Sequence, residues 1–251
     1  MRRILILGGT TEARRLAQRL GERADMAVTV SLAGRTTAPA AQGVPVRVGG
    51  FGGTEGLARY LTTERVDAFI DATHPYAAII SANAAAAAAA TSVPLLALRR
   101  PPWAPLPGDR WIEVADTAAA VEALGEAPRR VFVTLGKTEL GTFARAPQHY
   151  YLVRSVEPVD PPFPVPHVSY LTGRGPFTEA DDRTLLIAHA IEVVVAKNSG
   201  GTATYGKIAA ARLLGLPVIL LRRPTLPDVP SVGTVEDAVS WLDHAVALRG
   251  V

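Results

Sequence analysis

Short apolar runs that alternate with amphipathic stretches constrain the fold of this chain more than any other feature. Arg3–Leu7 is an apolar run, Thr11–Arg23 has apolar residues on one helical face, and Ala27–Ser31 is apolar again. This order predicts a strand, a helix and a strand. Continuous apolar strands alternating with helices indicate a parallel sheet covered on both faces. The pattern continues with predicted strands at Val46–Val48, Val66–Asp71 and Leu95–Leu98 and predicted helices at Thr54–Thr63 and Pro75–Thr91.

A proline-rich segment then interrupts the pattern. Arg99–Asp109 holds four prolines in eleven residues, which rules out regular structure and marks a domain boundary. A second α/β series follows, with predicted strands at Trp111–Val114, Val131–Leu135, His149–Val153, Glu192–Ala196 and Pro217–Leu221 and predicted helices at Thr117–Leu124, Thr178–His189, Thr204–Leu214 and Val235–Leu248. We therefore expect an α/β protein of two Rossmann-like domains with mainly parallel sheets. The expected division is an N-terminal domain over residues 1–98, a linker over 99–110 and a C-terminal domain over 111–251.

The composition is that of an ordered globular protein, because 48% of the 251 residues are hydrophobic and 20% are charged. The absence of cysteine excludes disulfides, thiolate metal sites, iron-sulfur clusters and cysteine nucleophiles. The sequence has no H-E-x-x-H motif and no paired metal-ligand spacing, so we expect no metal. It also has no visible export signal or membrane span, and we expect a cytoplasmic protein.

The distribution of charge says more than the net charge of +3. Ala72–Gly108 and Val193–Pro227 contain no acidic residue, and the second stretch carries five basic residues. These stretches could face a polyanion, although apolar core segments also lack carboxylates. Aromatic residues are sparse there and no helix-turn-helix is visible, so we expect no nucleic-acid partner.

A glycine turn follows the first predicted strand directly. Glycine at this position lets a pyrophosphate approach the backbone and the free N–H groups of the next helix. The full G-x-G-x-x-G pattern is absent, because Thr10 and Ala13 stand at its second and third glycine positions. An ordinary turn with a threonine N-cap is the alternative. The candidate dinucleotide-binding residues of this turn are Gly8, Gly9, Thr10, Thr11, Glu12 and Ala13.

The end of the second predicted strand bears on the choice of cofactor. NAD sites usually hold an acidic residue there, whereas NADP sites supply cations. The run from Ser31 to Thr36 has no carboxylate, and Arg35 could pair with a 2′-phosphate. NADPH is therefore preferred over NADH, with Ser31 and Arg35 as candidate contacts. The alternative is that Arg35 is a solvated loop cation.

Polar residues also follow other strands, at the edge where doubly wound sheets bind ligands. Asp71–Tyr76 places Thr73 there as a cofactor contact, and His74 and Tyr76 as donors of protons or hydrogen bonds. In the second half, Lys197–Thr202 combines lysine, asparagine and two glycines in a loop that could hold an anion. Gly136-Lys137-Thr138 is not a P-loop, because the required earlier glycine is Val131.

Taken together, these motifs resemble those of the precorrin-6A reductase family of cobalamin biosynthesis. The resemblance spans nearly the whole chain and rests on five blocks in order: Leu7–Ala13, Asp71–Tyr76, Arg100–Trp103, Gly173–Phe177 and Lys197–Gly201. It implies an NADPH-dependent reduction of a double bond in the precorrin-6A macrocycle, which gives precorrin-6B. The related cobalt-precorrin-6A reductases take the metallated substrate, and the sequence separates the two poorly.

The substrate that this resemblance implies is a tetrapyrrole rimmed with carboxylates, which cationic residues would bind. Its binding residues are predicted to be Arg99, Arg100, Lys137, Arg174, Asn198, Ser199, Gly200 and Lys207. His74, Tyr76 and Lys197 are the candidate catalytic residues, as sources of the proton. Neighbouring enzymes of the pathway are the further partners it suggests. A module that binds NADP without catalysis is the alternative from another class.

Overall fold

The computed structural model describes residues 1–34 and 40–247. The chain divides into two compact units, one formed by Met1–Pro101 with Pro224–Val251 and the other by Pro102–Arg223. Both units have a six-stranded sheet in which every strand pair is parallel. The expected α/β architecture with Rossmann-like parallel sheets is therefore confirmed.

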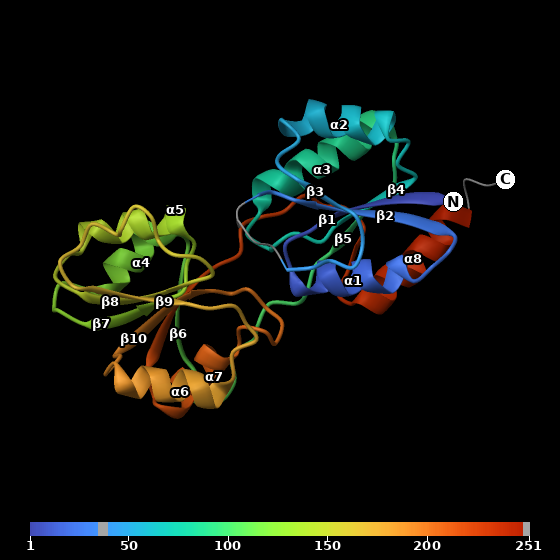
Figure 1. Ribbon diagram of the computed structural model, residues 1–251. Helices are drawn as coiled ribbons and strands as arrows, with labels where there is room; N and C mark the ends of the chain where they lie inside the picture. The colour runs from blue at the N-terminus through green and yellow to red at the C-terminus, as the bar shows by residue number, and fades with distance from the viewer. Residues whose placement is uncertain (35–39, 248–251) are drawn as a thin grey trace. The chain divides into compact units, whose positions relative to one another are not determined.

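The sheet of the first unit has the strand order β12-β5-β4-β1-β2-β3. Helices α1 and α8 cover one face of this sheet, and α2 and α3 cover the other (Figure 1). Its strands are β1 (Arg2–Leu7), β2 (Met26–Leu32), β3 (Val46–Val48), β4 (Ala68–Asp71), β5 (Leu95–Leu98) and β12 (Ser231–Val232). Its helices are α1 (Thr11–Gly21), α2 (Gly53–Thr63), α3 (Ala78–Thr91) and α8 (Val235–Ala247).

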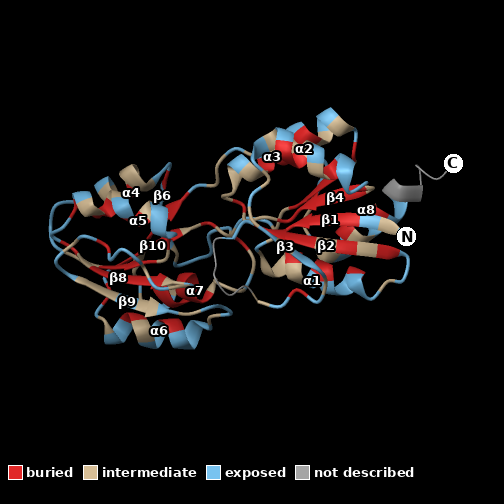
Figure 2. Ribbon diagram, turned by 45° about the horizontal axis from the view of Figure 1, so that its top comes forward, coloured by how far each residue is buried: buried red, intermediate tan, exposed pale blue. Residues whose placement is uncertain are grey.

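Apolar spacing explains how these elements pack. The buried residues of α1 are Ala13, Leu16, Ala17 and Leu20, which form one helical stripe against the sheet. On the opposite face, Ala84 and Ala87 of α3 are fully buried against α2 and the sheet. Figure 2 shows the resulting pattern, with buried strands and helices whose outer faces are exposed.

The C-terminal segment belongs to the first unit, which differs from the expected assignment of residues 111–251 to one domain. Ser231 and Val232 pair in parallel with Ala97 and Leu98 of β5. Ala238 and Leu242 of α8 are fully buried in the core that α1 shares. The physical reason is that the sheet face beside α1 needs a second apolar helix, and α8 supplies it.

The second unit has the strand order β6-β11-β10-β7-β8-β9. Helices α4 and α5 lie on one face of its sheet and α6 and α7 on the other (Figure 1). Its strands are β6 (Arg110–Val114), β7 (Arg130–Val133), β8 (Tyr150–Ser155), β9 (Val168–Thr172), β10 (Val193–Lys197) and β11 (Pro217–Leu221). Its helices are α4 (Thr117–Leu124), α5 (Lys137–Leu140), a 3₁₀ turn η1 (Gly141–Arg145), α6 (Glu179–Ala188) and α7 (Gly206–Leu213).

Several local elements differ from the predictions, among them α3 and β9. Helix α3 begins at Ala78, three residues later than expected, because a turn in which Ala77 N donates to His74 O precedes it. Strand β9 was not predicted, because it is an edge strand with half-buried or exposed residues and lacks an apolar run. Within residues 1–34 and 40–247, no helix is long and apolar enough to cross a membrane.

Each sheet has one point where the strand order reverses direction. In the first unit this point lies between β1 and β4, and in the second between β7 and β10. Ligands of open parallel sheets bind at the carboxyl ends of the strands beside such a point. The loops after these four strands are therefore where a site is expected.

Candidate functional site

The turn between β1 and α1 has glycine at positions 8 and 9 for two different reasons. A Cβ on Gly8 would lie 2.9 Å from Val30 Cγ1, so neighbouring β2 leaves no room for one. Gly9 has φ +117°, a conformation that favours glycine, and a Cβ there would meet no atom of the described chain within 4 Å. Gly9 therefore faces open space into which a ligand can come close.

Thr10 fixes this turn to the reversal point of the sheet. Its Oγ1 accepts from Ala13 N at 3.1 Å, which caps α1, and donates to Ala72 O at 2.8 Å just after β4. Thr11 is the first residue of α1 and Ala13 is fully buried. The predicted turn residue Glu12 pairs with Arg100 Nη1 at 2.6 Å, so its carboxylate already has a cationic partner.

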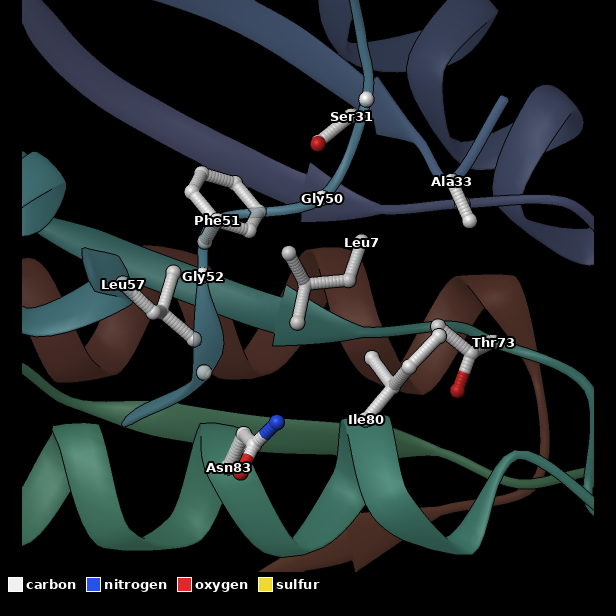
Figure 3. A pocket seen from close by; sticks show the side chains of 13 residues that line it. Leu7, Ser31, Ala33, Gly50, Phe51, Gly52, Leu57, Thr73, Ile80 and Asn83 are labelled. Atoms are coloured by element: carbon white, nitrogen blue, oxygen red, sulfur yellow. The ribbon is translucent and has the colours of Figure 1, made fainter. Parts of the chain in front are cut away.

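A pocket of about 160 Å³ lies beside this turn, at the carboxyl ends of β1, β2 and β3. In Figure 3, Leu7 lies between Ser31 on one side and Ile80 and Asn83 of α3 on the other. Three predicted cofactor contacts, Gly8, Ser31 and Thr73, line the pocket together.

A second glycine loop, Gly49–Gly53, forms another wall of the pocket, and sequence reasoning missed it. Gly49, Gly52 and Gly53 have positive φ angles. At Gly50, neither a positive φ angle nor packing requires glycine, because a Cβ there would meet nothing within 4 Å. The glycines of this wall carry no side chains, so a ligand can approach the backbone there, as a dinucleotide does. The four glycines in the run Gly49–Gly53, directly after the short predicted strand Val46–Val48, are the sequence signal from which this loop could have been predicted.

The cation predicted at the end of β2, Arg35, lies outside the described residues. A different arginine, Arg47 on β3, contacts Ser31 near the end of β2. Its Nη1 donates to Ser31 Oγ at 3.3 Å, and its guanidinium lies 3.9 Å from the centre of the Phe51 ring.

Buried Asp71 organises the loop between β4 and α3. Its Oδ1 accepts from Thr73 Oγ1 at 2.6 Å and from Thr73 N at 3.2 Å, while Oδ2 accepts from Ser81 Oγ at 2.5 Å. The same loop carries His74 and Tyr76, whose ring centres are 5.6 Å apart. Since His74 Nδ1 accepts from Tyr76 N at 3.3 Å, the proton of the neutral ring lies on Nε2.

Arg99 follows β5 and has an incompletely satisfied guanidinium. Its Nη1 donates to Pro227 O at 3.0 Å. Nε and Nη2 are buried and have no hydrogen-bond partner among the described residues. Buried polar groups are normally paired, so these two nitrogens call for an acceptor that the described residues do not supply, such as a water molecule or a ligand. A carboxylate matches them, because it can accept from both at once.

The reversal point of the second sheet holds an ion pair. Lys197, the last residue of β10, lies with Nζ 2.5 Å from Glu139 Oε1 of α5. The other carboxylate oxygen, Oε2, accepts from Gly136 N at 2.9 Å. Sequence reasoning predicted Lys197 and missed Glu139, because no local pattern links residues so far apart in the sequence.

Trp103 holds the loop that follows Lys197. Its N and O bond to the side chain of Asn198 at 2.7 and 3.0 Å, and its Nε1 donates to Gly201 O at 2.7 Å. Ser199 O accepts from Arg223 Nη2 at 3.0 Å, and buried Gly200 has φ +69°. The amide of Asn198 thus acts within the chain here, and its role toward substrate stays a prediction.

The other predicted substrate residues differ in exposure. Lys137 and Arg174 are exposed. Lys207 is buried, and its Nζ donates to Thr204 O at 2.7 Å and lies 5.4 Å from the centre of the Trp103 ring. Burial, together with the nearby charge of Arg154, lowers the pKa of Lys207 to about 7, while Asp182 opposes this shift. This placement favours a structural role for Lys207 over direct contact with substrate.

The predicted residues therefore fall into two sets. The first unit holds the residues of the β1–α1 turn together with Ser31, Thr73, His74, Tyr76, Arg99 and Arg100. The second unit holds Lys137, Arg174, Lys197, Asn198, Ser199, Gly200 and Lys207. The described residues contain no group of three or more His, Asp or Glu side chains that could hold a metal ion.

A glycine turn at the reversal point of a parallel sheet, with a pocket beside it, defines an α/β protein with Rossmann-like units. Over residues 3–243 the chain matches the precorrin-6x reductase (CbiJ/CobK) family, and it belongs to this family. The combination of a reductase family with this fold indicates a nicotinamide cofactor.

Individual relatives agree with this assignment. A precorrin-6A reductase of Rhodobacter capsulatus is 53% identical over 252 residues, covering 100% of both chains. A solved structure of CobK precorrin-6A reductase superposes with a TM-score of 0.92 at 52% identity, covering 98% of this chain and 97% of that one. A cobalt-precorrin-6A reductase of Priestia megaterium is 30% identical, covering 97% of each chain.

Proposed function

We propose that this chain reduces one double bond of the precorrin-6A macrocycle with NADPH and so forms precorrin-6B. The observation that carries the proposal is the 53% identity to a precorrin-6A reductase along the entire length of both chains. The lower identity of 30% to a cobalt-precorrin-6A reductase favours the metal-free substrate.

The first unit would hold the cofactor. The turn at Gly9 and the N-terminus of α1 suit a pyrophosphate, whereas Gly8 N already donates to Ser31 O at 2.9 Å. Ser31 and Thr73 offer hydroxyls in the adjoining pocket. Bound NADPH supplies the hydride, so the task of the chain is to bind and orient both reactants.

Cationic side chains would bind the carboxylates of the substrate. Arg99 fits this role best, because two of its buried nitrogens have no acceptor within the described chain. Arg174 and Lys137 are exposed cations, and Lys197 presents a charge at the reversal point of the second sheet. Each charge-assisted hydrogen bond contributes about 1.5 to 3 kcal/mol, so a few of them give useful affinity.

The reduction also requires a proton. His74 is the first proton donor that we propose, because its loop follows β4 at the edge of the sheet where ligands bind and its imidazolium form can give up a proton. Tyr76 and Lys197 are the other donors that we propose. Asp71 assists by holding Thr73, and with it the start of the loop that carries His74.

The experiment that tests this function is an assay of NADPH oxidation at 340 nm with metal-free and cobalt-loaded precorrin-6A in parallel. We expect oxidation with the metal-free macrocycle and a product two hydrogens heavier. Binding of NADPH without oxidation in the presence of either macrocycle would instead support a non-catalytic NADP-binding module.

A further inference from the structure

We propose that Arg47 determines the preference of the pocket for a nucleotide with a phosphate on the 2′-oxygen of its adenosine ribose. The inference rests on the proposed function, because it concerns the same cofactor pocket. It concerns a residue on β3, which is not the strand that usually supplies this cation.

The sheet register brings Arg47 to the relevant place. Strands β2 and β3 pair so that Ser31 lies opposite Arg47. Ser31 lines the pocket near the end of β2, where a dinucleotide presents its adenosine ribose. Because the side chains of paired residues point to the same face of a sheet, the guanidinium reaches the Ser31 hydroxyl at 3.3 Å.

The contacts of Arg47 fix its guanidinium firmly. Nη1 donates to Gly49 O as well as to Ser31 Oγ, and Nη2 donates to Gly50 O at 2.8 Å. The guanidinium lies 3.9 Å from the Phe51 ring centre, and the rings of Phe51 and Tyr60 pack edge to face at 5.1 Å. A cation held in this way loses little further conformational freedom when it meets an anion.

The charge of Arg47 is only partly used by these contacts. They employ three of the five N–H groups that a guanidinium offers. No nitrogen of Arg47 is among the buried side-chain atoms that lack partners within the described residues, and the residue is partly exposed. Nε, which takes no part in these hydrogen bonds, is therefore not fully buried, and a phosphate can accept from its N–H.

The residues that line the pocket include no group that would repel an anion. None of the thirteen described residues that line it carries a carboxylate. A ribose 2′-hydroxyl therefore lacks the acidic acceptor that NAD sites provide. A 2′-phosphate would instead meet the Ser31 hydroxyl and the positive charge of Arg47.

The test compares two probes that differ only in the 2′-phosphate, 2′,5′-ADP and 5′-AMP, by calorimetry on the full chain without substrate. We expect the wild-type chain to bind 2′,5′-ADP at least about tenfold more tightly than 5′-AMP. Arg47→Gln should reduce this preference by about tenfold, whereas Arg47→Lys should keep most of it. The control Arg59→Gln removes the same charge from an exposed site on α2 and should change nothing.

Arg35→Gln, measured in parallel, tests the other cation predicted for this phosphate. The inference is overturned if only Arg35→Gln changes the preference, or if Arg47→Gln and Arg47→Lys weaken both probes equally. The latter result would make Arg47 a purely structural support of the glycine loop. A wild-type chain that binds neither probe would overturn the proposed cofactor site itself, and the inference with it.

Discussion

Lys197 and Glu139 form an ion pair at the reversal point of the second sheet, with Nζ 2.5 Å from Oε1. Glu139 also accepts from Gly136 N through its second oxygen. A single carboxylate thereby orients both the lysine and the loop after β7. Glu139 is thus a positioning residue for Lys197.

If Lys197 acts on the substrate, Lys197→Met should lower kcat/KM for precorrin-6A by about 10- to 100-fold, which corresponds to the loss of one charge-assisted hydrogen bond. The dissociation constant of NADPH, measured by fluorescence, should stay within about twofold. Glu139→Gln should have a smaller effect on turnover and no further effect when added to Lys197→Met. Wild-type kinetics for Lys197→Met would contradict its assigned role.

Gly9→Val tests the turn between β1 and α1. Valine at φ +117° strains the backbone, and its branched side chain would fill the space that the pyrophosphate needs. We expect NADPH binding to weaken by more than about tenfold. The matched control is Gly125→Val, at φ +76° in the second unit, which should cause similar strain without loss of NADPH binding. A folded Gly9→Val variant with unchanged NADPH affinity would count against this assignment.

Replacing Arg99 by lysine should weaken the binding of precorrin-6A. Lysine has one ammonium group and cannot present the paired Nε and Nη2 donors to a carboxylate. Both Arg99→Lys and Arg99→Gln should raise KM for precorrin-6A by about tenfold or more. Arg15→Gln, an exposed change on α1, should have no effect. Equal KM values for the wild type and Arg99→Lys would exclude a paired contact.

The lowered pKa of Lys207 predicts how stability changes with pH. Between about pH 7 and 10.5 the unfolded chain keeps the proton on this lysine, whereas the folded chain has released it. The contribution of Lys207 to the free energy of unfolding should therefore rise with pH across this window, by up to about 1.4 kcal/mol per pH unit. Below pH 7 both states are protonated, and the burial of the charge destabilises the fold.

Urea unfolding of the wild type and of Lys207→Met at several pH values measures this effect. The difference in the free energy of unfolding isolates Lys207 from other titrating groups. We expect Lys207→Met to gain most, relative to the wild type, at and below pH 7, and this gain to shrink toward pH 10. A difference that does not vary with pH would contradict the assignment.

The sequence allowed the parallel sheets and the β1–α1 turn to be predicted, because apolar strands such as Ile4–Leu7 and the glycines at 8 and 9 leave strong local signals. The return of the C-terminal segment could not be predicted. Strand β12 has only two residues, and α8 is an ordinary amphipathic helix that could cover either sheet. Which sheet it joins depends on packing between distant residues, such as Leu242 in the core of α1.

The candidate site shows the same division between local and distant information. Gly8, Ser31 and Thr73 could be found because each follows or ends an apolar strand. Arg47 and Glu139 could not, since each matters through a contact to a residue in another element. The burial of Lys207 could not be predicted from the sequence either, because a lysine near the start of a helix is more often exposed.

A crystal structure of the full chain with bound NADP⁺ is the decisive test of the proposed cofactor site. We expect the pyrophosphate against the turn Gly8–Thr10 and the adenosine phosphate beside Ser31. An empty turn with the nucleotide bound elsewhere, or no nucleotide retained by the chain, would show that this site is wrongly assigned.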